Sequence, residues 1–194
     1  MLIVSLSYHL METACRQLRT WQDRHPLAQT LTISVNLAAM QLHSPSLLTH
    51  IDEILAHTGH PPQSLVLEIT ESMLVDDVQA TLAVLHALRQ RSIDLSIDDF
   101  GTDCASPSYL YQFPINHLKI DRSFVSQMQA SHHHYKIVET MITLSHQLDF
   151  TAIAEGIETE ADVDTLRKLG CDLGQGYWFG LAKPVALANG SPKT

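Results

Sequence analysis

The sequence predicts an α/β fold built around a parallel β-sheet of about six strands. Short apolar runs alternate along the chain with longer segments of helical periodicity, and the runs are centred on Ile33, Val66, Leu95, Leu118, Ala152 and Leu173. The run from Leu65 to Leu67 is continuously apolar, which is typical of a strand covered on both faces. No Gly/Ser linker or change of composition divides the 194 residues, so we expect one domain over residues 1–194.

The first elements are a helix, a strand and a second helix. Within residues 1–24, apolar side chains recur at helical spacing, which predicts one buried face made of Leu6, Leu10, Ala14, Cys15, Leu18 and Trp21. Residues 31–38 alternate apolar and polar positions, as a strand does, and Asn36 lies near the end of this run. The segment Ser44 to Ser46 predicts a helix start, and Gly59 predicts its end.

The middle of the chain carries acidic residues at the ends of its strands. The apolar strand over residues 65–70 includes Glu68, and a helix is expected over residues 75–91. Two strand-like runs follow, at residues 94–100 and 117–121. The first ends in Asp98 and Asp99, and the second carries Lys119 and Asp121.

The last third repeats the helix and strand alternation. A helix is expected over residues 131–148, a strand over residues 151–157 with Glu155 near its end, and a helix from a cap at Thr159 to Leu169. A short strand near Leu173 includes Gln175, and Tyr177 and Trp178 are expected to be packing residues. Residues 186–194 are predicted to be a frayed tail.

Composition restricts the classes of function. The net charge of -9 argues against binding of a nucleic acid polymer, because few cationic side chains would neutralise the phosphates. The three cysteines have no metal-type spacing and fit a reduced, cytoplasmic setting. No apolar run approaches the roughly 18 residues that a membrane-spanning helix needs.

Polar residues occupy the end of every predicted strand, where a buried strand does not otherwise need them. In a barrel of parallel strands these ends open on one face, so we expect the side chains to converge. The candidate site residues are Asn36, Glu68, Asp98, Asp99, Lys119, Asp121, Glu155 and Gln175. Such a ring of carboxylates repels itself unless a cation binds, and oxygen ligands of this kind suit Mg²⁺ or Mn²⁺ better than Zn²⁺. Two such metals would activate water for phosphodiester hydrolysis.

Strand alternation indicates how these side chains point. Lys119 and Asp121 share one face of their strand, so both can reach the site, and Lys119 can orient water or offset phosphate charge. Asp98 and Asp99 are adjacent and should point to opposite sides unless Gly101 distorts the strand end. One of these two acids is then expected to contact the metal ligands and not the metal itself.

Six segments of the chain together resemble one protein family. SVNLAA, LEITES, SIDDFGT, LKIDRSFV, AEGIETE and GCDLGQGYWFG, in this order, are similar to the motifs of the EAL domain family of cyclic di-GMP phosphodiesterases. The resemblance covers the chain from about Glu12 to Pro184. It implies an incomplete (β/α)8 TIM-type barrel that hydrolyses cyclic di-GMP to linear pGpG with Mg²⁺ or Mn²⁺.

The resemblance also implies a role for each candidate residue. Metal ligation falls to Asn36, Glu68, Asp98, Asp99 and Asp121. Lys119 matches the lysine that positions the attacking water, and Glu155 matches the glutamate beside the metals and that lysine. Glu158 matches a supporting acid on the same loop, and Gln175 matches a glutamine at the last strand.

The chain departs from the family pattern in three places. The name-giving Glu-Ala-Leu stretch of the first strand is absent, and the chain is roughly 50 to 60 residues shorter than a ~250-residue barrel. The loop after Thr102 reads Asp103 to Pro107 in place of the family's Gly-Tyr-Ser-Ser-Leu, in a region that couples metal binding to dimerisation. Asn116 replaces an aspartate.

These departures leave two functions open. The first is metal-dependent hydrolysis of cyclic di-GMP, and the second is a degenerate EAL module that binds cyclic di-GMP or a protein without hydrolysis. The expected partners are cyclic di-GMP, a second copy of the chain, and an upstream sensor or GGDEF-type domain of a longer protein. Structural roles at strand ends are the alternative for Asn36 and Gln175, and a helix N-terminal acid is the alternative for Glu158.

Overall fold

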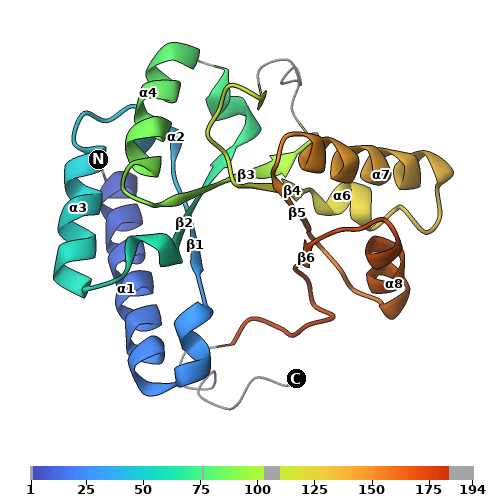
Figure 1. The fold of residues 1–194 in the computed structure, drawn as a ribbon, viewed down its shortest axis with the longest axis horizontal. Coiled ribbons are helices and arrows are strands. Elements are labelled where there is room, and N and C mark those ends of the chain that lie inside the picture. Colours follow the sequence, from blue (N-terminus) through green and yellow to red (C-terminus); the bar gives the residue numbers. More distant parts are fainter. Residues whose placement is uncertain (1, 76, 103–109, 184–194) are drawn as a thin grey trace.

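The computed structural model describes residues 2–75, 77–102 and 110–183, which are organised around one parallel sheet. The strands follow chain order across the sheet, β1-β2-β3-β4-β5-β6. They are β1 (Ile33–Asn36), β2 (Leu65–Thr70), β3 (Asp94–Phe100), β4 (His117–Ile120), β5 (Thr151–Ala154) and β6 (Leu173–Gly174). The sheet curves so that it forms part of a barrel (Figure 1). The predicted α/β fold with six parallel strands is therefore confirmed.

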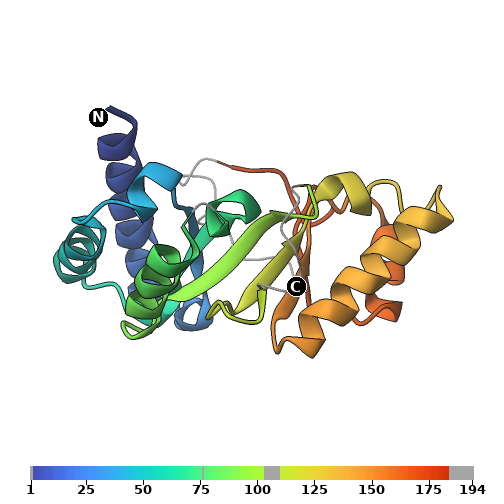
Figure 2. The same cartoon turned by 90° about the horizontal axis from the view of Figure 1, so that it is seen from above.

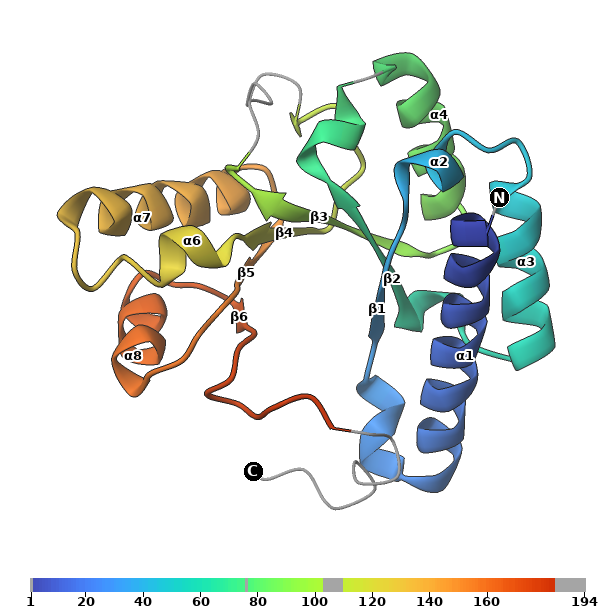
Figure 3. The ribbon, with the colours of Figure 1, turned by 180° about the vertical axis from the view of Figure 1, so that it is seen from behind.

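Helices connect the strands along the outer side of the curved sheet (Figures 1 and 3). They are α1 (Leu2–Arg24), α2 (Ala39–Leu42), α3 (Leu47–Thr58), α4 (Val78–Arg89), α6 (Arg122–Val125), α7 (His132–Gln147) and α8 (Glu160–Lys168). Short 3-10 turns cover Pro26–Thr30, Pro62–Ser64 and Glu71–Leu74. Figure 2 shows α1, α3 and α4 at one end of the sheet and α7 and α8 at the other.

Local side-chain and backbone chemistry sets several helix ends. Asp77 accepts a hydrogen bond from the backbone N–H of Ala80, so α4 begins at Val78 rather than at residue 75. Thr159 and Asp162 form a reciprocal capping box at the start of α8. Gly59 ends α3 with a φ of 61°, a left-handed conformation that glycine adopts without steric cost.

The main apolar core lies between the outer face of the sheet and the helices. Its strand side chains are completely buried and include Leu65, Leu67, Ile69, Leu95, Ile97, Leu118 and Ile120. Leu85 and Leu88 of α4 and Val138 of α7 belong to the same cluster. Burial of each large aliphatic side chain contributes roughly 1.5 to 3 kcal/mol, so this layer holds the strand ends in place.

The face that α1 buries differs from the expected stripe at its N-terminal half. Met11, Cys15 and Leu18 are buried, whereas Leu6 and Leu10 are 52% and 56% exposed. The prediction was therefore correct for the C-terminal half of the helix and wrong for Leu6 and Leu10. Apolar spacing identifies a helical face, but only the packing of neighbouring elements decides how far along the helix that face is covered.

Among the residues that the structure describes, both outer strands of the sheet have an open edge. In the part of the chain that the structure describes, β1 pairs only with β2 and β6 pairs only with β5. Large exposed apolar side chains gather near these edges, and they are Leu27, Leu31, Leu173, Tyr177, Trp178, Phe179 and Leu181. The expectation that Tyr177 and Trp178 are packing residues is thus wrong, because they are 69% and 48% exposed. Open apolar edges are what a partial barrel leaves behind.

Two expectations concern membrane crossing and the tail. Among residues 2–75, 77–102 and 110–183, no helix combines the length and apolar character needed to cross a bilayer. The segment 186–194, predicted to be a frayed tail, lies outside the described residues.

Candidate active site

The C-terminal ends of β2, β3, β4 and β5 bring together polar side chains that are far apart in the sequence. Because these strands are parallel and adjacent, their ends lie at one edge of the sheet. Glu68 comes from β2 and Asp98 from β3, while Lys119 comes from β4 and Glu155 directly follows β5. The backbone N–H of Glu155 donates to the carbonyl of Ile120, which extends the β4 and β5 pairing to this residue.

Lys119 is the centre of this group. Its ammonium nitrogen Nζ lies 2.7 Å from Asp98 Oδ1, 2.6 Å from Glu155 Oε1 and 3.1 Å from Glu68 Oε1. The residue is 4% exposed, so these contacts operate where water screens little. Burial by itself lowers the pKa of Lys119. The contacts with Asp98, Glu155 and Glu68 raise it by more than burial lowers it, so the pKa of Lys119 lies above its ordinary value. Lys119 is therefore cationic at neutral pH.

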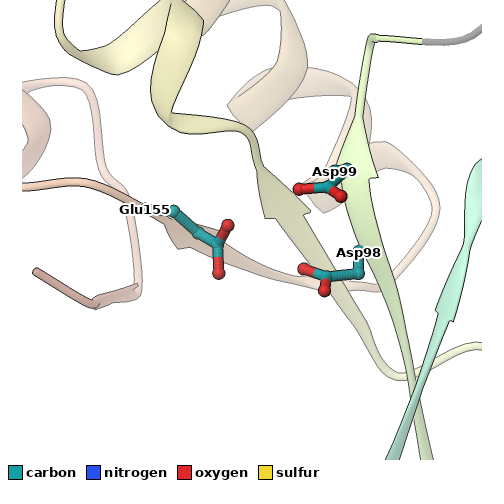
Figure 4. Close-up of side chains that lie close together, drawn as sticks. All are labelled: Asp98, Asp99 and Glu155. Atoms are coloured by element: carbon teal, nitrogen blue, oxygen red, sulfur yellow. The ribbon is translucent and has the colours of Figure 1, made fainter. Parts of the chain in front are cut away.

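Asp98 and Asp99 both face the site, although they are adjacent in a strand. The register between β3 and β4 shifts between Ile97 and Phe100, and Asp99 has a φ of 54°. This irregularity turns Asp99 away from the alternating direction of the strand. One carboxylate oxygen from each of Asp98, Asp99 and Glu155 lies within 4.8 Å of the others, and Figure 4 shows the three groups pointing toward one another. The strand distortion therefore occurs at Asp99 itself.

The pKa values of Asp99 and Glu155 reflect burial and the repulsion between neighbouring carboxylates. Burial, together with the charges of Asp98 and Asp121, raises the pKa of Asp99. Burial also raises the pKa of Glu155, and contact with Lys119 only partly offsets this effect. A divalent cation would remove the repulsion, because carboxylate oxygens are the ligands that Mg²⁺ and Mn²⁺ prefer. The donor set of Asp98, Asp99 and Glu155 fits such an ion.

Asp121 caps the short helix α6 beside this cluster. Its Oδ1 accepts a hydrogen bond of 2.9 Å from the backbone N–H of Ser123. Although burial raises the pKa of Asp121, hydrogen bonds from Ser123 and the backbone of Arg122 lower it below its ordinary value. Asp121 also interacts electrostatically with Asp99. It is therefore an ionised carboxylate at the edge of the acidic cluster.

The remaining sequence-predicted residues lie around this centre. Asn36 ends the open strand β1, is exposed, and is opposite Glu68 in the strand register. Glu158 and Gln175 line a hollow of about 200 Å³ together with Glu155, Arg122 and Tyr177. The hollow adjoins the acidic cluster through Glu155, so these side chains surround a space where a ligand can lie next to the carboxylates.

Sequence reasoning overlooked Glu71, which directly follows β2 and hydrogen-bonds to the backbone beside the site. Glu71 is 2% exposed, and its Oε2 accepts a hydrogen bond of 3.0 Å from the backbone N–H of Gly101. This bond connects the end of β2 to the backbone that follows Asp98 and Asp99. The signal was available in the LEITES segment, because an acid directly after a buried strand needs a partner.

Asn116 precedes β4 and connects three strands. Its side-chain Oδ1 accepts from the N–H of Leu95, and its backbone N–H donates to the carbonyl of the same residue. Its carbonyl accepts from the N–H of Thr151. Either an asparagine or an aspartate can accept from Leu95, so this departure preserves the strand junction. The loop at residues 103–107, whose sequence differs from the family pattern, lies outside the described residues.

Comparison with known proteins identifies the family. The family model described as EAL domain matches residues 1–184. The chain belongs to the EAL domain family. Among the curated relatives of this EAL domain is the signaling protein YkoW of Bacillus subtilis, which is 38% identical over 95% of this chain and 22% of its own length. The bifunctional diguanylate cyclase/cyclic di-GMP phosphodiesterase MucR of Pseudomonas aeruginosa is 36% identical over 95% of the chain and 27% of its own.

Solved EAL structures have the same fold. The PaMucR phosphodiesterase in complex with c-di-GMP superposes with a TM-score of 0.91 at 35% identity, over 96% of this EAL domain and 75% of that chain. The EAL domain of Mycobacterium smegmatis DcpA gives a TM-score of 0.86 at 31% identity, over 92% of this chain and 79% of that one. The present EAL domain spans about a quarter of the length of the curated relatives that it matches.

Proposed function

We propose that this EAL domain hydrolyses cyclic di-GMP to linear pGpG with Mg²⁺ or Mn²⁺. The observation that carries the proposal is the contact of one buried cation, Lys119, with the carboxylates of Glu68, Asp98 and Glu155 at the strand ends. MucR and NbdA of Pseudomonas aeruginosa, both relatives by sequence, are named cyclic di-GMP phosphodiesterases. The adjacent acidic cluster has oxygen donors suited to a divalent cation.

The proposed metal ligands are Asn36, Glu68, Asp98, Asp99 and Asp121. A bound divalent metal supplies positive charge that stabilises the developing phosphate charge and lowers the pKa of water. Cationic Lys119 holds the attacking water in place or offsets phosphate charge, because its raised pKa keeps the proton on Nζ. Glu155 accepts a proton more readily than an ordinary carboxylate, because its pKa is raised. Glu158 and Gln175 are proposed to contact the substrate in the adjoining hollow.

The reaction requires that water attack phosphorus while the bond to the leaving sugar oxygen breaks. The leaving oxygen takes up a proton, and the linear dinucleotide is released. Lys119 Nζ and Glu155 Oε1 are in direct contact at 2.6 Å, so a water that lies beside this pair can contact a proton acceptor and a cation at the same time.

The proposal extends to partners and location. Cyclic di-GMP is the proposed ligand, and a sensor or GGDEF-type domain of a longer protein is a proposed partner, because relatives include the bifunctional MucR and the oxygen sensor protein DosP of Escherichia coli. The open edges of β1 and β6, with exposed side chains such as Leu27 and Phe179, support association with a second copy. Free Cys15 and Cys171 support a cytoplasmic location.

The second candidate function is binding of cyclic di-GMP without hydrolysis. It is favoured by the position of Asn36 on β1, which pairs with one neighbouring strand only among the described residues, so that the proposed contact of Asn36 with a metal has support from one side. A looser ligand weakens charge stabilisation in the transition state more than it weakens binding of the nucleotide.

The deciding experiment measures product and binding on the same protein. The chain is incubated with cyclic di-GMP and Mn²⁺, pGpG is followed by chromatography, and nucleotide binding is followed by calorimetry. We expect turnover that EDTA stops and that Glu68→Ala lowers at least about a hundredfold, because a metal contributes several kcal/mol to catalysis. Glu53→Ala, which removes an exposed acid of α3, serves as the matched control. Binding without turnover would establish the second candidate.

A further inference from the structure

A row of polar side chains crosses the inner face of the sheet directly beneath the acidic cluster. The strand register aligns one polar residue from each of five strands, and this inner row consists of Asn36, Glu68, Ser96, His117 and Thr151. Residues aligned in register on parallel strands point to the same face. His117 precedes Lys119 by two positions and therefore faces the barrel interior as Lys119 does. The interior of a parallel barrel is ordinarily packed with branched apolar side chains, so a polar row requires an explanation.

Two members of the inner row have buried polar atoms without a hydrogen-bond partner among the described residues. Ser96 is 1% exposed, and its hydroxyl Oγ has no hydrogen-bond partner among the described residues. Ring nitrogen Nδ1 of His117 is also buried, and the described part of the chain offers it no partner either. An unpaired buried polar group costs about 1 to 3 kcal/mol, so two adjacent ones indicate a shared polar ligand.

The surroundings of His117 indicate which of its nitrogens accepts. Its Nε2 lies 3.7 Å from Asp94 Oδ2, and Asp94 is in contact with Arg89. An N–H at Nε2 directed toward this carboxylate leaves Nδ1 as a hydrogen-bond acceptor. Nδ1 then needs a donor, and Ser96, a register neighbour of His117 on β3, has the buried hydroxyl that also lacks a partner among the described residues.

Glu68, the neighbour of Ser96 on β2, supplies the third partner. Its Oε1 lies 3.1 Å from Lys119 Nζ, and the residue is 7% exposed. Neighbouring strands are roughly 4.8 Å apart, a separation that one water can bridge between short side chains. A single water beneath the cluster would accept from the Ser96 hydroxyl and donate to His117 Nδ1 and to the Glu68 carboxylate. This water then makes three hydrogen bonds to the protein, the usual number for an ordered buried water.

We propose that Ser96 and His117, joined by one bound water, form a hydrogen-bonded support that orients the Glu68 carboxylate toward the metal. Ser96 and His117 are positioning residues, since they act through Glu68. This inference rests on the proposed role of Glu68 as a metal ligand. Partners that orient a ligating carboxylate typically change metal affinity by 10- to 100-fold when they are removed.

The first test compares two serine substitutions. Ser96→Ala removes the proposed hydroxyl donor, whereas Ser145→Ala removes an equally buried serine whose hydroxyl donates to the Met141 carbonyl within α7. We expect Ser96→Ala to weaken Mn²⁺ binding in calorimetry about tenfold and Ser145→Ala to leave it unchanged. Equal affinity of the two variants would overturn the proposal.

The second test uses two substitutions of similar shape at His117. His117→Asn keeps a hydrogen-bond acceptor near the Nδ1 position, and His117→Leu does not, while both remove the contact with Asp94. We expect Mn²⁺ affinity close to that of the unchanged protein for His117→Asn and about tenfold lower for His117→Leu. Equal loss in both variants would contradict a hydrogen-bonding role.

A readout without metal separates this inference from the proposed function. The ¹⁵N resonance of His117 Nδ1 reports whether the nitrogen accepts a hydrogen bond. We expect Ser96→Ala to shift this resonance and Ser145→Ala to leave it in place. If Ser96→Ala shifts the His117 Nδ1 resonance but the unchanged protein binds no Mn²⁺, the hydrogen-bonded support is upheld and the proposed function is refuted. An unchanged resonance in Ser96→Ala would refute the support itself.

Discussion

Replacement of Lys119 by methionine tests whether one cation holds the three strand-end carboxylates together. The substitution keeps the length and apolar stem of the side chain but removes the charge that contacts Glu68, Asp98 and Glu155 at 2.6 to 3.1 Å. Removal of one partner of a buried ion pair costs about 3 to 5 kcal/mol. The lower end applies here, because the carboxylates can take up protons once the cation is gone. We therefore expect the metal-free variant to lose about 3 kcal/mol of unfolding free energy.

The measurement is thermal unfolding with and without Mn²⁺. For a chain of this size each kcal/mol shifts Tm by roughly 2 to 4 °C, so Tm in EDTA should fall by about 6 to 12 °C. Mn²⁺ should recover part of the loss by replacing the missing positive charge, but turnover should not return. Lys136→Met is the control, since Lys136 is an exposed lysine that pairs with Glu139 on the surface of α7. If Lys119→Met were no less stable than Lys136→Met, the central role of Lys119 would be refuted.

Further predictions concern protonation, backbone conformation and support of the site. The pKa values of Asp99 and Glu155 are raised, so these acids take up protons at a higher pH than ordinary carboxyl groups. As the pH is lowered, Mn²⁺ affinity should therefore begin to fall before the ordinary carboxyl pKa is reached. A titration in which affinity is lost only at the ordinary carboxyl pKa would contradict this prediction. Asp99→Asn should be about 1 kcal/mol more stable in urea than Asp99→Ala, because asparagine tolerates a left-handed backbone and alanine does not; equal stability would show that the φ of 54° carries no strain. Glu71→Ala should lower the free energy of unfolding by roughly 1 to 3 kcal/mol, because the N–H of Gly101 loses its acceptor, and Glu71→Gln should retain most of this stability in the same assay.

Much of the fold followed from side-chain periodicity. Alternating and continuous apolar runs predicted all six strands, because a strand that is buried on one or both faces must carry this pattern. Helix ends were less accurate, since the start of α4 depends on the cap at Asp77. The exposure of Leu6 and Leu10 escaped prediction, because it depends on which elements cover α1.

The sequence predicted the residue types of the site but not the directions of all their side chains. Acids and a lysine at the ends of parallel strands were sufficient to predict that Glu68, Asp98, Lys119 and Glu155 would meet. Alternation alone predicted opposite directions for Asp98 and Asp99, whereas the register shift of β3 brings both to one side.

The sequence by itself determined the order of strands and helices and the residue types at the strand ends, because both depend on local spacing. The tertiary structure decided the rest. It established the backbone turn at Asp99, the hydrogen bond from Gly101 to Glu71 and the alignment of Ser96 with Glu68 and His117. These features depend on the register between strands that are distant along the chain, and a change of register by one residue would reverse every side chain of a strand.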